Sequence, residues 1–233
     1  NALYYSKELV NESRLLKQSD CNLGLVKTLI IQKKLVDYSL HDSLTDALNS
    51  IHAAYRVLEQ VNNSVLTPYD SQNKEHEEKL SRLWKTMKPN EPLKSRISSQ
   101  WVDIGFQGTD PATDFRGMGI QGLDDLLYFT QHYPQQVQSI LQHANHPQQW
   151  YPYAIVGINI SKFTFQLLES RKLQLYLFGN EYQELYCYLF YSFDRSWRFT
   201  VMEFEEKFKE FQFIVEKELK EQEPMRIQYT NIQ

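Results

Sequence analysis

Residues that break helices are scarce in this chain. Only 8 glycines and 8 prolines occur among 233 residues, and long stretches contain neither. Glycine and proline are the least favourable residues in a helix interior, so these stretches favour helices. Aromatic residues make up 14% of the chain, which supplies large apolar side chains for a core and argues against disorder. The sequence therefore predicts an all-α fold, built from many helices in a single domain.

The spacing of apolar residues supports this prediction. Near the C-terminus they recur at steps of three or four, at Trp197, Val201, Phe204, Phe208, Phe211, Val215 and Leu219. This period places them on one face of a single long helix, where an aromatic stripe is usually core packing. The β-branched segment 154–160 also fits a buried strand, but the helical period continues through Phe163 and Leu167. We therefore predict a helix there as well.

Local residue chemistry predicts where two further helices begin. Acidic residues are favourable in the first turn of a helix, because they interact with the positive end of its dipole. We therefore expect Asp124 and Asp125 to lie in the first turn of the helix that carries Leu123, Leu126 and Leu127. Proline suits the first position of a helix, so Pro134 is expected to open the next one.

One polar segment divides the chain. Residues 67–75, TPYDSQNKE, are rich in turn-forming residues and are predicted to be a linker. We predict that residues 1–66 form a helical N-terminal extension packed on the core, and that residues 76–233 form the main domain. A length of 233 residues fits one domain with such an extension.

Charge, cysteine content and hydropathy exclude several classes of protein. The net charge of −4 lacks the basic surplus of a nucleic-acid-binding protein. Cys21 and Cys187 are the two cysteines, and they form neither a zinc-binding spacing nor a disulfide framework. No apolar run approaches the roughly 20 residues that a membrane span needs. We therefore expect a cytoplasmic protein with no nucleic-acid partner and no membrane span.

Residues 101–129 differ in composition from the rest of the chain. Five of the eight glycines lie here, at Gly105, Gly108, Gly117, Gly119 and Gly122. Glycine is entropically costly to order, so this density indicates tight turns or close approach of backbone segments. The acidic residues Asp110 and Asp114 alternate with Thr113 and with a single arginine, Arg116. Asp and Thr at these positions are typical of turns and helix caps.

Three motifs of known chemistry have partial matches, and each lacks the context that it needs. Residues 117–122 read GMGIQG, but turn-forming residues precede them instead of the strand of a dinucleotide site. The aspartates lack the alternating ligands and terminal glutamate of a calcium-binding loop, so we interpret them as caps. His143 and His146 have a metal-like spacing without a third ligand in register, and we interpret them as solvent-exposed.

Arg116 is the one residue for which the sequence leaves two interpretations open. It can form an ion pair with Asp110 or Asp114 and thereby fix the turn. Alternatively, it can be an arginine finger, because a planar and permanently charged guanidinium suits the charge that develops on a transferred phosphoryl group. Residue chemistry by itself does not choose between the two.

The segment closely resembles the signature of ELMO-domain proteins, the engulfment-and-motility family, and of its small ELMOD members. The matching positions are Trp101, 104–108 (IGFQG), 110–111 (DP), 113–119 (TDFRGMG) and 122–123 (GL), and the flanks 80–101, 151–161 and 184–197 agree with the family pattern. The resemblance covers roughly residues 75–215. It implies an all-helical fold and, in the ELMOD branch, activation of GTP hydrolysis by Arf and Arf-like small GTPases.

The resemblance also implies roles for individual residues. It places the catalytic arginine of the ELMOD branch on Arg116. The residues expected to support the motif or to bind the GTPase are Gln107, Gly108, Asp110, Thr113, Asp114, Gly117 and Gly119. Gln107 has two interpretations, contact with the nucleotide or the GTPase switch region, and a buried amide that caps the turn. Trp101, Ile104 and Phe106 are expected to anchor the motif to the core. The chain itself would bind no cofactor or metal, because the GTPase carries GTP and Mg²⁺.

A different class of function also fits this resemblance. An ELMO fold can be a non-catalytic structural or scaffolding subunit of a larger assembly, for example a cytoskeletal or ciliary one, and the larger ELMO proteins are scaffolds for Rac exchange factors. Candidate contact surfaces are the glutamine-rich segments with Gln131, Gln135, Gln136, Gln138, Gln142, Gln148 and Gln149. An organelle surface or a cilium is compatible with the cytoplasmic location. An exposed Arg116 beside an open groove would favour the arginine finger, whereas an Arg116 covered by a partner subunit would favour the structural role.

Overall fold

The computed structural model describes residues 6–170, 172 and 182–221. Their regular secondary structure is helical and contains no strand, which confirms the predicted all-α fold. The α-helices are α2 (Val10–Leu15), α3 (Leu23–Lys34), α4 (His41–Leu66), α5 (Lys74–Met87), α6 (Gly119–His132), α7 (Pro134–Ala144), α8 (Tyr153–Glu169), α9 (Tyr182–Ser196) and α10 (Phe204–Glu221). The short 3-10 helices are η1 (Tyr38–Leu40), η2 (Ser99–Ile104), η3 (Pro111–Gly117) and η4 (Val201–Glu203).

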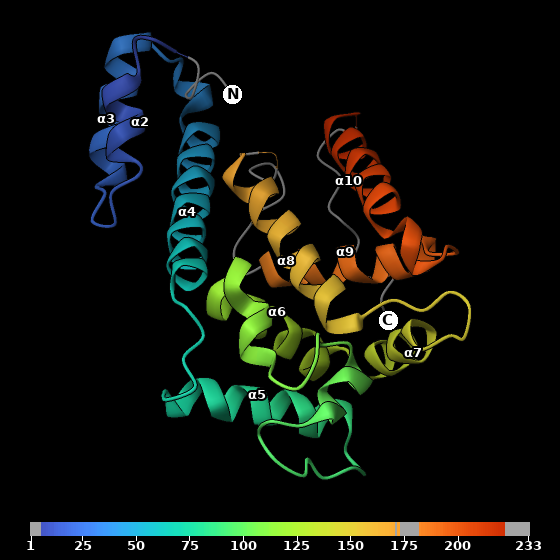
Figure 1. Cartoon of the computed structure of the whole chain (residues 1–233). Helices are drawn as coiled ribbons and strands as arrows, with labels where there is room; N and C mark the ends of the chain where they lie inside the picture. The colour runs from blue at the N-terminus through green and yellow to red at the C-terminus, as the bar shows by residue number, and fades with distance from the viewer. Residues whose placement is uncertain (1–5, 171, 173–181, 222–233) are drawn as a thin grey trace.

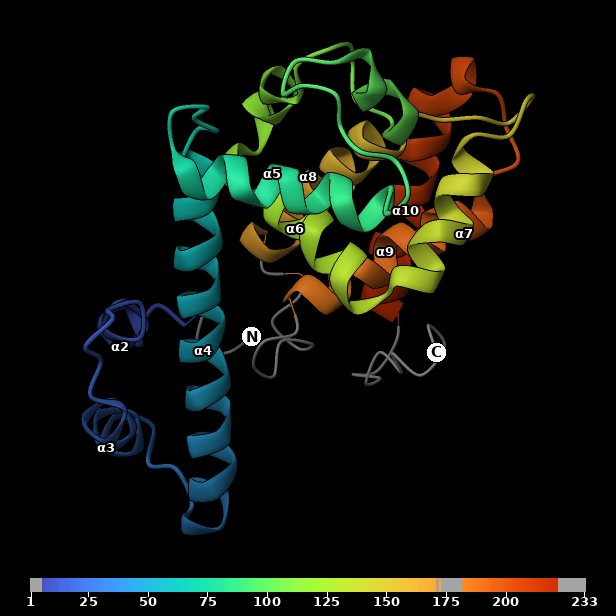
Figure 2. The same cartoon turned by 90° about the horizontal axis from the view of Figure 1, so that it is seen from below.

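Helix α6 forms the centre of the main body. It contacts α4, α5, α7, α8 and α9, and it lies among them in both views (Figures 1 and 2). Its residues Leu123, Leu126 and Phe129 are completely buried. Phe129 contacts Phe190 of α9, with 5.6 Å between the ring centroids. Each large apolar side chain buried in this way contributes roughly 1.5–3 kcal/mol to the stability of the fold. This core therefore holds the glycine-rich segment 101–129 in place.

The N-terminal helices enclose a second, smaller apolar cluster that includes Val26 and Leu48. We call α2, α3 and the part of α4 that covers them the N-terminal arm. In both views α4 separates α2 and α3 from the main body (Figures 1 and 2). The same helix also places Ala54 and Val61 in the main cluster. The 26-residue α4 therefore connects the arm to the main body.

Two of the predicted helices of the second half are confirmed, and one predicted start is wrong. Residues 154–160 lie in α8, and Pro134 is the first residue of α7. Asp124 and Asp125 were expected in the first turn of their helix, but α6 already begins at Gly119. The helix starts earlier because it begins against the end of α4, where the amide N–H of Ile120 donates to the carbonyl of Thr67 at 2.9 Å.

The single long C-terminal helix expected from the aromatic stripe is interrupted. Helix α9 ends at Ser196, and α10 begins at Phe204. Between them Thr200 and Glu203 form a capping box, in which the amide N–H of Thr200 donates to the Glu203 carboxylate at 3.0 Å. A capping box starts a new helix, which explains the interruption. Most of the stripe packs as predicted: Trp197, Phe208, Phe211 and Val215 belong to the buried core, and Phe204 and Leu219 pack against it.

Candidate functional site

The glycine-rich segment forms two 3-10 helices, η2 and η3, joined by a tight turn that lies against the start of α8. Gly105 ends η2 with a φ of +84°, in the left-handed region that favours glycine. Its carbonyl accepts a hydrogen bond of 3.2 Å from the amide N–H of Ile155 in α8. A β-carbon on Gly105 would lie only 2.1 Å from the backbone nitrogen of Tyr153. The turn therefore depends on a glycine at this position.

Aromatic side chains anchor this segment to the core. Trp101 and Ile104 are completely buried, and Phe106 is nearly so, which confirms their predicted role as anchors. The Phe106 ring contacts Trp101 and Phe115 edge-to-face, with 5.7 Å between the centroids in both pairs. Phe115 in turn stacks on Tyr69 at 5.3 Å. Because Phe115 and Arg116 are adjacent, the anchoring of one fixes the backbone position of the other.

The acidic residues of the segment fix its backbone. Asp110 caps η3, and its Oδ1 accepts the amide N–H of Ala112 at 3.0 Å. Thr113 Oγ1 donates to the Asp110 carbonyl at 3.0 Å, and Asp114 Oδ2 accepts the amide N–H of Gln107 at 2.8 Å. Burial raises the pKa of Asp114, against the opposing effects of the Gln107 hydrogen bond and the Arg116 charge. These contacts agree with the expected roles of all three side chains in shaping the turn.

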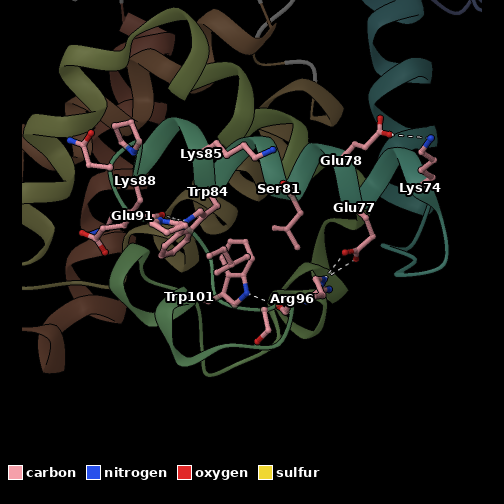
Figure 3. Close-up of a pocket in the computed structure, with 16 residues that line it drawn as sticks. Lys74, Glu77, Glu78, Ser81, Trp84, Lys85, Lys88, Glu91, Arg96 and Trp101 are labelled. Carbon is pink, nitrogen blue, oxygen red and sulfur yellow. Dashed lines mark hydrogen bonds and ion pairs between the residues drawn. The ribbon is translucent and has the colours of Figure 1, made fainter.

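A second arginine, Arg96, ties the turn to α5. Its Nη1 donates to Asp110 Oδ1 at 2.8 Å, and its Nε donates to both Glu77 oxygens at 2.9 and 2.7 Å. Figure 3 shows Arg96 directed at Glu77 across the groove beside α5. Tyr69 completes the network, because its hydroxyl donates to Glu77 at 2.6 Å. The sequence did not indicate Arg96, since its partners lie 14 and 19 residues away on separate elements.

Arg116 itself is free of such partners. Its side chain is exposed on η3, and within the described residues it forms no hydrogen bond or ion pair. Asp110 pairs with Arg96 instead, and no ion pair joins Arg116 to Asp114, although the Arg116 charge still acts to lower the pKa of that carboxyl against the larger effect of burial. Of the two interpretations of Arg116, the ion pair that fixes the turn is therefore not formed within the described residues. The neighbouring Gly117 is open to solvent, with no atom within 4 Å of the place that a β-carbon would take. The turn is therefore held rigidly by other residues while the guanidinium remains available.

The remaining residues of the predicted site lie around this turn. Gln107 is exposed, so its interpretation as a buried amide is wrong; its backbone, not its side chain, bonds to Asp114. Gly108 has a φ of +99° and also faces open space. Gly119 is buried at the start of α6, where a β-carbon would lie 2.4 Å from the carbonyl oxygen of Thr67. Gln107 and Gly108 thus belong to the surface beside Arg116, whereas Gly119 connects the turn to α4.

A hollow of about 260 Å³ opens beside Arg116. Gln107, Asp114 and Arg116 line it from the turn, and Asn159 and Lys162 line it from α8. Sequence reasoning missed Asn159 and Lys162, because only the packing of α8 against η3 brings them next to Arg116. The site is therefore an exposed arginine on a fixed turn, next to a small open hollow lined by both polar and apolar side chains.

Comparison with known proteins identifies the family. The model of the ELMO/CED-12 family matches residues 59–208. The chain belongs to the ELMO/CED-12 family. Mouse ELMO domain-containing protein 2 is 40% identical over 211 residues, which cover 84% of this chain and 71% of that protein. ELMO domain-containing protein B of Dictyostelium discoideum is 36% identical over 224 residues, covering 89% and 78%. Human ELMO domain-containing protein 1 is 40% identical over 162 residues, covering 55% and 48%. No solved structure matches the chain.

The ELMO domain carries a second and larger hollow, of about 720 Å³, between α5 and the segment that follows it (Figure 3). Trp84 and Trp101 lie at its base, and both indole N–H groups donate to backbone carbonyls, those of Glu91 at 2.7 Å and Arg96 at 2.9 Å. Arg116 does not line this hollow. Its lining carries basic and acidic side chains together, and the arginine among them, Arg96, is already paired with Glu77 and Asp110. Because Arg116 lines the smaller hollow, that hollow is the candidate site.

Other sites considered from the sequence have a structural explanation in the ELMO domain. The glycine motif at 117–122 follows the 3-10 helix η3 rather than a strand, so it lacks the context of a dinucleotide site. His143 is half-buried rather than exposed, because its Nδ1 bonds to Asp194 at 2.8 Å, whereas His146 is exposed as expected. In the described part of the chain, no three His, Cys, Asp or Glu side chains form a group that could hold a metal ion. No helix of that part is both long and apolar enough to span a membrane.

Proposed function

We propose that this protein activates GTP hydrolysis by an Arf-family small GTPase, and that Arg116 is the arginine finger. The observation that carries the proposal is the state of Arg116. Its guanidinium is exposed beside an open hollow, and its backbone is fixed by Gly105, Phe115 and Asp114. A side chain without intramolecular partners can contact a bound GTPase without first breaking an ion pair. A fixed backbone lowers the entropy that this contact costs.

The proposed mechanism divides the chemistry between the two proteins. The GTPase provides GTP, Mg²⁺ and the glutamine that orients the attacking water. This chain provides positive charge through Arg116 at the bridging oxygen between the β- and γ-phosphates, where negative charge develops in the transition state. Asp114 and Asp110 aim the side chain by fixing η3. Gln107 and Gly108 lie on the exposed surface next to it, where the switch loops of the GTPase can approach.

The resemblance to the ELMOD branch supports this function over a purely structural one. The signature around Arg116 is intact, and the chain belongs to the ELMO/CED-12 family. The arginine that stabilises the turn is Arg96, which pairs with Glu77 and Asp110, whereas Arg116 forms no such pair and lies exposed on the same turn. The cytoplasmic face of an organelle membrane is the proposed place of action. The hydrolysis assay described next would identify which GTPase responds.

Single-turnover GTP hydrolysis tests the proposal. A panel of Arf and Arf-like GTPases, each loaded with GTP, is mixed with the wild-type protein, with Arg116→Lys or with Arg82→Lys. Arg82 is a matched control, because it is exposed on α5 and outside the hollow. Lysine keeps the positive charge but lacks the planar guanidinium with its paired N–H donors. Arginine fingers accelerate hydrolysis by about 10³–10⁵-fold, and Arg116→Lys should lose most of this stimulation.

Two results would contradict the proposal. If no GTPase of the panel responds to the folded wild-type protein, the chain is not an activator of this class. If Arg116→Lys stimulates as well as Arg82→Lys and the wild type, Arg116 is not a finger. In the first case the structural alternative becomes the leading function, and a stable complex with other proteins is the next thing to measure. In the second case the activation stands, but it does not depend on Arg116.

A further inference from the structure

One face of α8 is partly exposed next to the arginine turn. Ile155, Asn159 and Lys162 follow one another at helical steps of four and three residues, and all three line the hollow beside Arg116. The opposite face of α8 carries Val156, Ile160 and other residues of the core, so the helix cannot rotate away from this position. We call Ile155, Asn159 and Lys162 the α8 stripe.

Lys162 is available to a partner. It is exposed, and within the described residues it forms no hydrogen bond or ion pair. Many other lysines of the chain are paired, for example Lys79 with Asp124 at 2.9 Å and Lys172 with Glu216 at 2.6 Å. Lys162 is thus a second cation with a free charge beside the hollow, on the side that α8 contributes.

The hollow is more positive than the protein as a whole. Arg116 and Lys162 are its two cations, and Asp114 is the one carboxylate among its described lining residues. Asp114 already accepts the amide N–H of Gln107, so part of its charge is used inside the turn. The lining therefore has a formal charge of about +1, in a chain whose net charge is −4. A surface of this kind favours an acidic partner.

We propose that the α8 stripe is the second half of the GTPase-docking surface, and that Lys162 pairs with an acidic side chain at the rim of the GTPase nucleotide site. This inference rests on the proposed function, because it takes the finger at Arg116 as the point that enters that site. Ile155 supplies a small apolar contact, and the Asn159 amide borders the same hollow. Lys162 is a positioning residue that increases the rate and strength of association, whereas Arg116 acts on the chemical step.

This division of roles follows from the two side chains. A guanidinium offers a planar fork that matches phosphoryl oxygens, whereas an ammonium is a compact and strongly hydrated charge. Charges at the rim of an interface act chiefly on the association rate and its salt dependence. Lys162 lies on α8, where it can receive an acidic side chain while Arg116 on η3 reaches into the nucleotide site.

The test measures GTP hydrolysis by a responding GTPase as a function of the concentration of this protein. Lys162→Glu should raise the concentration that gives half-maximal stimulation by about tenfold, and should leave the maximal rate unchanged. Lys162→Arg should restore the wild-type value. Arg116→Lys should instead lower the maximal rate. Lys209→Glu is the matched control, because Lys209 is also an exposed lysine on a helix but lies outside the hollow.

Salt and charge reversal make the test specific to the proposed ion pair. The difference between the wild type and Lys162→Glu should shrink at about 0.5 M salt, because exposed charges are then screened. Replacing the acidic residues at the rim of the GTPase nucleotide site with lysine, one at a time, should identify one variant that restores binding to Lys162→Glu. Circular dichroism confirms that each variant remains helical.

The possible failures are distinguishable. If the wild type stimulates and Arg116→Lys does not, but Lys162→Glu behaves like Lys209→Glu, the proposed function stands and the role of Lys162 is refuted. If no GTPase is stimulated, binding of the GTPases loaded with a non-hydrolysable GTP analogue is measured directly. Binding that Lys162→Glu weakens would then support the docking surface without the catalytic role, and no binding at all would overturn both proposals.

Discussion

Gly105→Ala is the substitution that most directly perturbs the turn carrying Arg116. The native φ of +84° costs a residue other than glycine about 1–2 kcal/mol. The new β-carbon would also lie 2.1 Å from the backbone nitrogen of Tyr153 and 2.6 Å from the carbonyl carbon of Pro152. These are backbone atoms that no side-chain rotation can move, so the turn must separate from the start of α8. Overpacking of this kind costs about 1–3 kcal/mol. We expect Gly105→Ala to lower the free energy of unfolding by about 3 kcal/mol.

Two other glycines of the segment provide matched controls. Gly108 has a φ of +99° but open space around it, so Gly108→Ala should cost only about 1 kcal/mol for the backbone conformation. Gly117 has neither a positive φ nor a close neighbour, so Gly117→Ala should lose almost nothing. Urea unfolding at neutral pH, followed by tryptophan fluorescence, measures all three. The reasoning is refuted if Gly105→Ala destabilises the protein no more than Gly108→Ala does.

Three further substitutions test individual charged side chains. Burial raises the pKa of Asp125 to about 7, so the folded state binds its proton more tightly than the unfolded state, whose Asp has a pKa of about 3.9. The free energy of unfolding should therefore fall by up to about 4 kcal/mol as the pH rises from about 4 to about 7. Asp125→Asn should remove this fall when both proteins are unfolded with urea at a series of pH values. The same dependence on pH in both proteins would disprove the role of Asp125. Arg96→Leu leaves Glu77 and Asp110 without their shared partner and should cost about 2 kcal/mol, or about 4–8 °C in melting temperature. Arg116→Leu removes no intramolecular hydrogen bond or ion pair and should leave the melting temperature unchanged, so a reversed order of the two arginines would contradict the structure.

Local patterns in the sequence predicted most of the helices. The helical period through Val156 and Phe163 correctly favoured a helix over a strand. Apolar residues continue at helical spacing over a stretch longer than a typical strand, as a buried helix requires. Pro134 was correctly placed at the start of α7. The aromatic stripe correctly predicted a packed C-terminal face, but its period continued through the break between α9 and α10. The capping residues Thr200 and Glu203, which begin the new helix, do not disturb that period.

Local patterns in the sequence did not predict contacts between residues that are far apart in the chain. The signature segment indicated that Arg116 matters, but not whether Asp110 and Asp114 were its partners. The answer depends on Arg96, which reaches Asp110 only because α5 brings Glu77 to the same place. The position of Lys162 beside Arg116 likewise follows from the packing of η3 against α8. Both arrangements are tertiary, so they require the folded structure.

The central claim, that Arg116 acts in the transition state, is tested most directly by comparing two binding affinities. A responding Arf-family GTPase is loaded either with a non-hydrolysable GTP analogue or with GDP and aluminium fluoride, which mimics the transferred phosphoryl group. An interaction that accelerates the chemical step must be stronger in the transition state than in the ground state. We predict that Arg116→Lys binds the GTP-analogue complex nearly as well as the wild type does, but binds the aluminium fluoride complex at least about tenfold more weakly. Equal losses for the two complexes, or no loss for either, would contradict the account.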